Sequence, residues 1–495
     1  MAESYYWHDY ETWGAIPARD RPCQFAGLRT DAELNPVGDP LVLFSRPADD
    51  LLPHPDACLI TGITPQHAVR EGIPEAEFAL AIQRELAVPG TCGVGYNSLH
   101  FDDEVTRYLF YRNLLDPYAH AFRNGNSRWD LIDVLRLAHA LRPDGIQWPE
   151  REPGVASFKL EHLTAANDID HAGAHDALAD VRATIGMARR LKQAQPRLFD
   201  YALTLRDTGK VLALIDKGRP LLHVSQRYPA AQGCIAPVAI AGMHPDFAKK
   251  YFCFDLRQDP AMLLDLSVEQ IRARLFTPAA ELPEGVERIP LKGIKSNAAP
   301  MLAPLGTLEP AAAARWDIDL QQVERHADRI AQSKRLIADK LAEVYRGQQH
   351  PVETDPDLTL YSGGFFSDAD RRRMQALHDL SPQALAHHQP RFEDQRLPTL
   401  LFRMRARSWP ETLTDTERED WDAWRLERLT IPDAGGSVTI DGFVQRIAEL
   451  RDEAVSESAP KPMSEPMLKQ AQVPTRLALL ARLEEWAEQI MDVSD

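Results

Sequence analysis

Hydrophobic and polar residues alternate at the start of the chain, where residues 5–13 read YYWHDYETW. Side chains of a β-strand point alternately to opposite faces, so this aromatic-rich run predicts a strand. Two shorter strands are expected over residues 24–29 and 40–44, around turn-prone segments at Thr30-Asp31 and Asn35-Pro36. Together the three runs predict an antiparallel meander.

Helices are expected to follow and to alternate with further strands. Thr64 is an N-cap candidate with Pro65 at the first helical position, and a second helix is expected over residues 74–86. The short apolar run at 92–96 predicts another strand. This alternation predicts an α/β or α+β layer fold.

Further helix starts carry polar residues at their ends. One helix is expected after residue 101, one over residues 129–137 and one with Asp176 as its N-cap. Ser157 is a cap candidate for a helix that covers residues 158–163. The polar side chains near these starts are the places to look for chemistry.

The length and composition predict a globular protein with several cores. The 495 residues (55.6 kDa) suggest roughly two to four domains, and 26% charged residues beside 44% hydrophobic ones argue against a disordered or fibrous chain. No apolar run is long enough to cross a bilayer, and residues 1–7 lack the pattern of a signal peptide. The five cysteines form no CxxC pair, which argues against a disulfide framework or a thiolate zinc site. We therefore expect a cytoplasmic protein.

The net charge limits how a nucleic acid could be bound. A formal charge of −17 and a pI near 5.4 argue against polyanion binding by the whole surface. Any nucleic-acid groove must therefore be a local basic patch. Acids buried around a metal would also count in this total, so the charge is weak evidence against a nucleic-acid substrate.

Asp9 and Glu11 are the first candidate catalytic residues, because they are separated by one residue and share a face of the predicted strand. Two neighbouring carboxylates repel each other unless a cation lies between them, and hard divalent ions prefer oxygen ligands. The alternative is a surface strand whose acids are solvated. Asp102 at a helix start is another candidate ligand, although an isolated aspartate there is more often a plain N-cap.

His175 and Asp180 flank the start of the helix that Asp176 caps, one just before it and the other about one turn inside it. Both can therefore approach one centre from the same helix end. A lone histidine ahead of a helix is usually a surface or capping residue. Four acids and a histidine that arrive from a strand and two helix starts instead predict a metal-dependent catalytic centre.

The same residues carry a resemblance to a known family. Asp9-Tyr10-Glu11 and the segments 97–102 and 175–180 resemble the three motifs of the DEDDh exonucleases. Within that superfamily the chain is similar to the bacterial exonuclease I family of single-strand-specific deoxyribonucleases. Further segments that resemble this family are 8–12, 59–66, 101–107, 126–130, 174–181, 196–201 and 364–370. The resemblance therefore covers essentially the whole chain.

The resemblance implies roles for individual residues. The metal-binding acids would be Asp9, Glu11, Asp102 and Asp180, with His175 as the catalytic histidine. The residues implied to line the path of the DNA strand are Glu11, Arg107, Tyr118, Phe122, Arg136 and Lys159. Phe122 stands where the family has a larger aromatic residue, and it keeps a stacking face. Lys159 stands where the family has arginine, so it keeps the charge but loses the bidentate fork.

The resemblance also implies three domains. These are an α/β (α+β) ribonuclease H-like exonuclease domain over residues 1–195, an SH3-like β domain over 196–350 and an all-α C-terminal domain over 351–495. The pattern along the chain supports this division, because strand-like runs at 211–215, 221–224 and 251–256 lie among Gly and Pro residues. The pattern is helical from Asp317 onward, and residues 351–357 are the expected linker.

The implied activity is degradation of single-stranded DNA in the 3′ to 5′ direction, with release of 5′ mononucleotides, in DNA repair and recombination. Two Mg²⁺ ions would suit the carboxylate ligands and assist hydrolysis, and His175 would accept a proton near neutral pH. A narrow basic channel with aromatic stacking platforms would select single strands.

The implied partners are single-stranded DNA and the acidic C-terminal tail of single-stranded DNA-binding protein, for a monomeric chain with no membrane association. The sequence does not place a docking pocket for that tail, because Glu309 stands where a basic residue is expected. A DEDDh ribonuclease or oligoribonuclease is one alternative, against which the two additional domains argue. A catalytically silent single-strand DNA-binding protein is the other, against which the complete set of acids and histidine argues.

Overall fold

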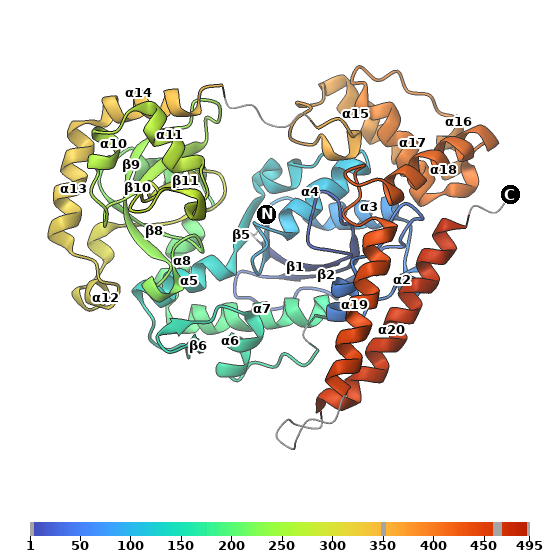
Figure 1. Ribbon diagram of the computed structural model, residues 1–495, viewed down its shortest axis with the longest axis horizontal. Coiled ribbons are helices and arrows are strands. Elements are labelled where there is room, and N and C mark those ends of the chain that lie inside the picture. The colour runs from blue at the N-terminus through green and yellow to red at the C-terminus, as the bar shows by residue number, and fades with distance from the viewer. Residues whose placement is uncertain (1–3, 174, 348–352, 459–467, 493–495) are drawn as a thin grey trace.

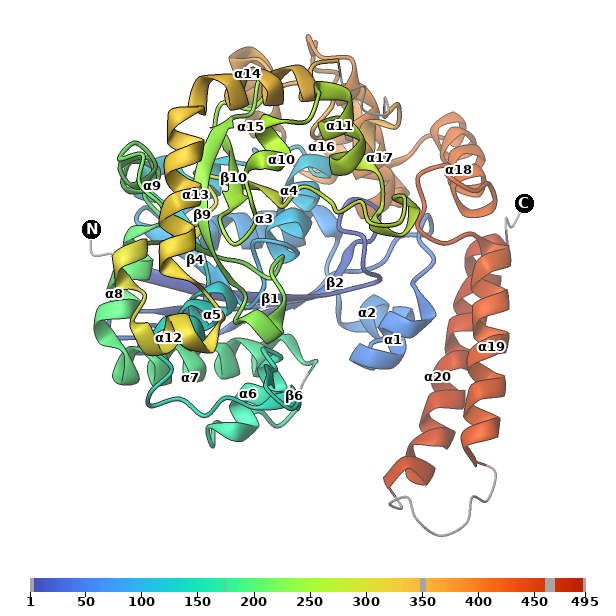
Figure 2. The same cartoon turned by 60° about the vertical axis from the view of Figure 1, so that its left-hand side comes forward.

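The computed structural model describes residues 4–173, 175–347, 353–458 and 468–492. The chain forms three successive parts, and the first is built on a five-stranded mixed sheet (Figure 1). The second part, with its own five-stranded sheet, and the helical third part lie on two sides of the first, as both views show (Figures 1 and 2). Across these described ranges, no helix combines the length and apolar character that crossing a membrane requires.

The sheet of the first part has the strand order β3-β2-β1-β4-β5. Its strands are β1 (Ser4–Thr12), β2 (Pro22–Thr30), β3 (Leu41–Phe44), β4 (Thr91–Gly95) and β5 (Ser127–Asp130). Strand β2 pairs antiparallel with both β1 and β3, whereas β4 runs parallel to β1 and β5. The predicted meander and the predicted strand after residue 91 are confirmed.

Helices cover both faces of this sheet. They are α1 (Pro55–Thr61), α2 (Pro65–Glu71), α3 (Glu75–Leu86), α4 (Asp102–Arg112), α5 (Leu131–Leu141), α6 (Leu160–Ala166) and α7 (Ala177–Ala194), with 3-10 turns at Ala119–Ala121 and Arg123–Gly125 and a ribbon of β6 (Glu150–Glu152) and β7 (Val155–Ala156). Trp7 of β1 packs in one core with residues of α5 and α7, and Tyr10 packs in another with residues of α3 and α4. Alternate residues of β1 therefore enter different cores.

Helix caps show which local signals hold. Thr64 and Asp176 each accept a backbone N–H hydrogen bond at the start of α2 and α7, so both predicted caps are confirmed. The prediction of Ser157 as a cap is wrong, because α6 begins at Leu160 and the Ser157 hydroxyl instead contacts the His162 ring at 2.8 Å.

The segment 129–137 is divided between two elements. Trp129 and Asp130 end β5, and α5 begins at Leu131. The Asp130 carboxylate caps α5 by accepting a hydrogen bond from the Ile132 backbone N–H at 3.2 Å. The helix predicted for this segment is correct, but it starts two residues later than its pattern indicates.

The second part has the strand order β11-β10-β9-β8-β12, and each neighbouring pair is antiparallel. Its strands are β8 (Leu221–Val224), β9 (Ile235–Met243), β10 (Lys250–Asp255), β11 (Leu291–Lys295) and β12 (Met301–Pro304). Its helices are α8 (Pro196–Thr204), α9 (Thr208–Ile215), α10 (Ala261–Leu264), α11 (Val268–Phe276), α12 (Pro310–Arg315), α13 (Leu320–Gln332) and α14 (Lys334–Tyr345), with 3-10 turns at Ala230–Gln232, Ala279–Glu281 and Leu305–Thr307. The strands predicted over 221–224 and 251–256 are confirmed.

The strand predicted over residues 211–215 is wrong, because these residues belong to α9. Asp207 caps this helix by accepting a hydrogen bond from the Gly209 backbone N–H at 2.7 Å. Val211 and Ile215 lie one turn apart, and both are buried. A short apolar run fits a strand and a buried helix equally well, and the Asp207 cap decides for the helix.

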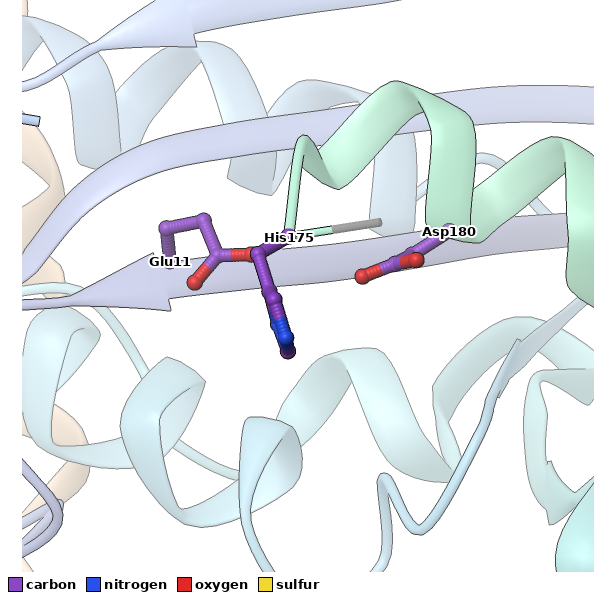
Figure 3. Close-up of side chains that lie close together, drawn as sticks. All are labelled: Glu11, His175 and Asp180. Atoms are coloured by element: carbon purple, nitrogen blue, oxygen red, sulfur yellow. The ribbon is translucent and has the colours of Figure 1, made fainter. Parts of the chain in front are cut away.

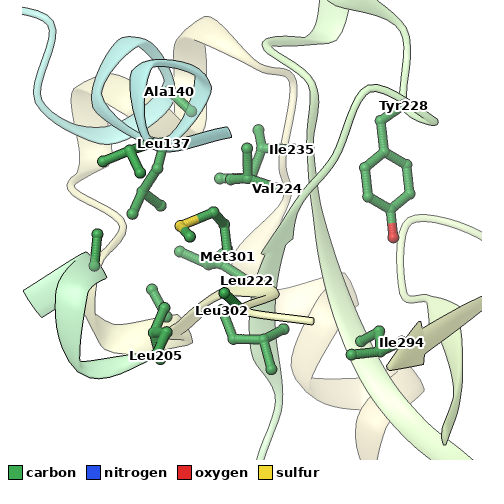
Figure 4. Close-up of a cluster of buried hydrophobic side chains, with 14 of the residues drawn as sticks. Leu137, Ala140, Leu205, Leu222, Val224, Tyr228, Ile235, Ile294, Met301 and Leu302 are labelled. Carbon is green, nitrogen blue, oxygen red and sulfur yellow. The ribbon is translucent and has the colours of Figure 1, made fainter. Parts of the chain in front are cut away.

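The first and second parts share one hydrophobic core (Figure 4). Leu137 and Ala140 of α5 lie on one side of the cluster, and Leu222 of β8 and Met301 of β12 face them. Burying a large aliphatic side chain contributes about 1.5–3 kcal/mol. The second sheet is therefore packed against α5 and not merely tethered to it.

The third part is helical, as predicted. Its helices are α15 (Asp368–Leu377), α16 (Pro382–His387), α17 (Arg396–Ser408), α18 (Asp415–Thr430), α19 (Ile440–Ser458) and α20 (Leu468–Met491), with 3-10 turns at Pro356–Leu358 and Pro410–Thr412. Phe443 of α19 and Trp486 of α20 share a core with Cys58 of α1 and Ala68 of α2. Residues 351 and 352 of the predicted linker lie outside the described residues.

A buried network of charged residues also joins the third part to the first. The Arg407 guanidinium of α17 lies 3.1 Å from an Asp50 oxygen and 2.5 Å from an Asp357 oxygen, and Arg21 lies 2.5 Å from Asp50. All four side chains are almost fully buried. Burial opposes ionisation of Asp50 and Asp357, but the surrounding guanidinium groups hold the pKa of both carboxyls well below the ordinary value.

We predict that Arg407→Leu lowers the free energy of unfolding by about 3–5 kcal/mol, because the variant leaves two buried carboxylates without their shared partner. Urea unfolding followed by circular dichroism measures the change. Arg446→Leu is the matched control, since Arg446 pairs with Asp56 at 2.7 Å on the surface and solvent screens that pair. Equal losses in the two variants would contradict the importance of the buried network.

Candidate active site

Strand β1 directs two of the predicted ligands toward α7. Asp9 and Glu11 have the same parity as Trp7, which packs against α5 and α7. Asp102 comes from the other side of the chain path, as the first residue of α4. Its Oδ1 accepts a hydrogen bond from the Tyr10 backbone N–H at 3.1 Å, between the two β1 acids. Phe101 occupies the N-cap position, so the interpretation of Asp102 as a plain N-cap is wrong.

The start of α7 supplies the remaining two candidates. Asp176 caps the helix, Asp180 lies in its first turn and His175 precedes it with a positive φ of 70°. A non-glycine residue in this conformation carries backbone strain that is common at functional sites. In Figure 3 the carboxylates of Glu11 and Asp180 lie on either side of the His175 side chain. Ligand atoms of these three residues all lie within 4.8 Å of one another.

A cavity of about 320 Å³ opens beside these residues. It is lined by Asp9, Tyr96, Asn97, Ile132, Arg136, Phe158, Lys159, Leu160, Glu161, His171, His175, Asp180 and Gln226. Two buried polar atoms of its lining, Asn97 Oδ1 and Arg136 Nε, have no hydrogen-bond partner in the described part of the chain. Buried polar groups are normally paired, so these two atoms indicate a polar ligand at this position.

Burial and mutual repulsion raise the pKa of the acids. Burial is the main cause for Asp9, whose pKa lies well above the ordinary value, and the Asp102 and Glu11 carboxylates raise it further. Burial raises the pKa of Glu11 to about 8, with an added contribution from Asp180. Burial likewise raises the pKa of Asp102 to about 7. A carboxylate cluster of this kind is poised to bind a cation, which would favour the charged forms.

The donor set fits hard divalent metal ions. Asp9, Glu11, Asp102 and Asp180 offer carboxylate oxygens, and His175 is the one histidine among the predicted ligands. Oxygen donors suit Mg²⁺ and similar ions, and the repulsion among the acids is what such an ion would relieve.

The predicted DNA-contacting residues fall into two groups. Arg136 and Lys159 line the cavity, where Arg136 is held by Asp133 at 2.7 Å and Lys159 is exposed. Arg107, Tyr118 and Phe122 do not line this cavity.

The second group lies where the third part meets α4. Arg107 pairs with Asp103 and Glu104, both at 2.8 Å, and its guanidinium lies 5.7 Å from the centre of the Tyr118 ring. The Tyr118 ring makes an edge contact with Phe365 of the third part, with 5.7 Å between the ring centres. Phe122 is exposed over 63% of its surface. An exposed aromatic face is available for stacking, whereas Arg107 is already paired with acids.

Family models match three successive segments of the chain. A model described as Exonuclease matches residues 6–187, one described as Exonuclease I SH3-like domain matches 206–347, and one described as Exonuclease I C-terminal domain matches 354–490. Exodeoxyribonuclease I from Escherichia coli strain K12 is 45% identical over 430 residues, which cover 86% of this chain and 90% of that relative. The chain belongs to the exodeoxyribonuclease I family.

Solved structures of this family share the fold. The exonuclease I of Methylocaldum szegediense, described as moderately thermophilic, has a TM-score of 0.91 and 47% identity, over 99% of this chain and 100% of that one. Escherichia coli exonuclease I in complex with a dA16 oligonucleotide has a TM-score of 0.90 and 40% identity, with the same coverage. The predicted family, enzyme class and fold class are therefore confirmed, and the three parts are the nuclease domain, the SH3-like domain and the C-terminal domain.

Sequence reasoning missed two residues that organise this exodeoxyribonuclease I site. The His171 Nε2 contacts the Asp180 carboxylate, while the other ring nitrogen lies 3.1 Å from the Thr164 hydroxyl. A ring held at both nitrogens orients the carboxylate. The only local signal was its position four residues before His175.

Asp130 is the second missed residue. Besides capping α5, its carboxylate accepts hydrogen bonds from the backbone N–H groups of Asn97 at 2.8 Å and Leu99 at 3.1 Å. It thereby orders the loop that leads from β4 to Asp102. These contacts join segments about thirty residues apart, which no local pattern along the chain indicates.

We predict that Asp9→Asn raises the melting temperature of the metal-free exodeoxyribonuclease I at pH 8. The raised pKa of Asp102, about 7, means that the folded protein binds more protons than the unfolded chain between about pH 4 and 7, so repulsion lowers stability as pH rises through this window. Removing the Asp9 charge relieves that repulsion, whereas added Mg²⁺ should stabilise the wild type more than the variant.

Thermal melts in EDTA and in MgCl₂ measure both effects. Asp216→Asn serves as the control, because Asp216 is an exposed carboxylate at the end of α9 in another domain. A wild-type protein with the same melting temperature in EDTA and MgCl₂ would contradict a metal site at these acids.

Proposed function

We propose that this protein degrades single-stranded DNA from the 3′ end and releases 5′ mononucleotides, using two Mg²⁺ ions, in DNA repair and recombination. The observation that carries the proposal is the convergence of Glu11, His175 and Asp180 within 4.8 Å, beside a cavity that Arg136 and Lys159 line. A family member from Escherichia coli has been crystallised with single-stranded DNA and with zinc, which supports a nucleic-acid substrate and a divalent ion.

The catalytic roles follow from the chemistry of each side chain. Asp9, Glu11, Asp102 and Asp180 would hold the metal ions. When bound, such ions activate water and neutralise charge that develops on a phosphate ester. His175 is exposed at the mouth of the site and accepts the proton of the attacking water. Its Nδ1 or Nε2 faces the carboxylates of Glu11 and Asp180, which favour the protonated ring that results.

The strand would be held by charge and by stacking. Arg136 and Lys159 contribute positive charge in the cavity, where the terminal phosphates would lie, and Glu11 contacts the same end of the strand. Tyr118 and Phe122 offer aromatic faces, each able to contribute about 1–3 kcal/mol per stacked base. Arg107 lies beneath Tyr118 and would act through that ring as much as through its charge.

The remaining parts of the proposal concern organisation and partners. We infer domain boundaries after residues 195 and 350, a monomeric state, a cytoplasmic location and binding of the acidic tail of single-stranded DNA-binding protein. An exonuclease I structure that contains this protein supports the last point. Glu309 forms an ion pair with Arg142 at 3.1 Å, so this pair offers less positive charge to an acidic tail than two basic residues would.

We predict that a labelled oligodeoxynucleotide with a free single-stranded 3′ end is shortened stepwise in the presence of Mg²⁺, whereas blunt duplex DNA and a 3′-blocked strand are spared. Denaturing gels with a 5′ label follow the reaction, and an RNA of the same sequence tests the ribonuclease alternative. Equal digestion of circular single strands would indicate an endonuclease. Asp180→Ala controls for contaminating nucleases, because it removes a proposed ligand while leaving the aromatic contacts in place.

We predict that His175→Ala lowers kcat by about 10²–10⁴ with little change in strand affinity, because a general base acts in the chemical step. Single-turnover cleavage at fixed Mg²⁺ across pH measures the rate, and the wild-type limb that rises through the neutral region should change in the variant. His162→Ala is the matched control, since His162 is also exposed but contacts Ser157. An undiminished rate with the same pH profile would return His175 to a structural role.

A further inference from the structure

Four cations of the SH3-like domain gather near the end of β11. Arg227 lies in the loop between β8 and β9, Lys250 begins β10, and Lys292 and Lys295 belong to β11. Within the described ranges none of these side chains forms an ion pair. We call these four residues the basic cluster. In a chain with 73 acids and a net charge of −17, four neighbouring cations without a carboxylate partner need a physical reason.

The register of the sheet forces two of these charges together. Lys250 and Lys295 are direct partners across the antiparallel pair of β10 and β11, so their side chains share one face. A Cβ at Gly293 would lie 2.9 Å from Lys250 Cε, so the glycine leaves the space that the lysine stem occupies. Like charges placed directly opposite each other destabilise a sheet. The isolated protein therefore carries an unfavourable contact here.

The electrostatics of the lysines confirm that these charges lie close together. Burial lowers the pKa of Lys250, and the Lys295 and Arg227 cations lower it further. Burial also lowers the pKa of Lys292, with a further contribution from Arg227. Arg227 is thus the residue whose charge reaches both lysines.

The basic cluster is continuous with the catalytic cavity. Gln226 of the SH3-like domain lines that cavity, and Arg227 is the next residue. Burial lowers the pKa of His100 in the nuclease domain, and the Arg227 and Lys295 cations add to this effect. The backbone of Asn297, two residues after Lys295, accepts a hydrogen bond from Arg128 of the nuclease domain at 3.4 Å. The cluster therefore faces the boundary between the two domains.

We propose that the basic cluster binds the phosphodiester backbone of the single strand, on the side of the catalytic cavity away from the terminal nucleotide. This proposal rests on the proposed function and names a second contact region for the same substrate. The bound phosphates would offset the repulsion between Lys250 and Lys295. An extended row of cations that starts at the catalytic cavity fits a chain of phosphates, because each phosphate carries one charge at a regular spacing.

An acidic protein segment is the other anion that such a cluster could attract. The continuity through Gln226 favours the nucleic acid, since the strand whose end occupies the cavity must leave it past neighbouring side chains. The two ligands differ in one measurable respect. Binding of the strand to the cluster should depend on oligonucleotide length, whereas binding of an acidic peptide should not involve the oligonucleotide at all.

The test compares the wild type with Lys250→Gln/Lys295→Gln by fluorescence anisotropy of labelled oligothymidylates in EDTA, where no cleavage occurs. For an oligonucleotide of about 20 nucleotides, we expect the variant to bind about tenfold more weakly and the slope of log affinity against log salt to fall by about 0.7 per lost phosphate contact. With about four nucleotides the loss should shrink, because so short a strand cannot span both regions.

The metal-free melting temperature of the variant should equal or exceed that of the wild type, because a repulsion has been removed. The single variant Lys295→Gln, at an exposed position, guards against misfolding. Lys210→Gln/Lys217→Gln is the matched control, since it removes two exposed lysines of the same domain outside the cluster.

Three outcomes would overturn the proposal: an unchanged affinity and salt slope at all lengths, an equal loss in the control, or weakened binding of an acidic peptide with normal oligonucleotide affinity. Failure of the proposed function has a separate signature, because the wild type would then cleave no strand in Mg²⁺. Normal wild-type cleavage with unchanged binding by the cluster variant would instead refute this inference alone.

Discussion

The buried Asp103 carboxylate is the interaction on which the arrangement around the active site depends. Arg107 lies 2.8 Å from Asp103, Arg128 contacts it as well, and His120 lies 3.8 Å away. Burial opposes its ionisation, but Arg128 above all holds the pKa of Asp103 well below the ordinary value. Arg128 also reaches the SH3-like domain, and Arg107 donates a hydrogen bond to Tyr361 of the C-terminal domain at 2.9 Å. Both added domains are thus fixed to the residue next to the proposed ligand Asp102.

Opposite charges are handled in two different ways in this molecule. At Asp103, and between Asp50 and Arg407, cations and carboxylates neutralise each other inside the protein. In the catalytic cavity and in the basic cluster, charges of one sign are gathered and left without protein partners. Such concentrations of like charge are unfavourable in the isolated protein, and they attract ligands of the opposite sign. The positions of unneutralised charge therefore describe the ligands better than the net charge does.

The sequence predicted elements and motifs where the signal is local. The parity of Asp9 and Glu11, the caps at Thr64 and Asp176 and the alternation of strands and helices all depend on residues close in the chain. The assignment of 211–215 failed because a short apolar run does not distinguish a strand from a buried helix. The roles of His171 and Asp130 come from contacts between segments, so the chain read in order gives no sign of them. Family resemblance supplied the domain types, which periodicity alone would not have named.

The network around Arg407 bears on how the chain folds during synthesis. Asp50 lies in the nuclease domain, and Arg21 is the one cation of its network within the first 195 residues. The other partners, Arg407 and Arg428, leave the ribosome only when most of the C-terminal domain has been made. Until then a carboxylate destined for the interior remains incompletely neutralised, and its hydration opposes burial. The nuclease domain is therefore completed by the last third of the chain, and a truncated product would not reach the packed state of the whole protein.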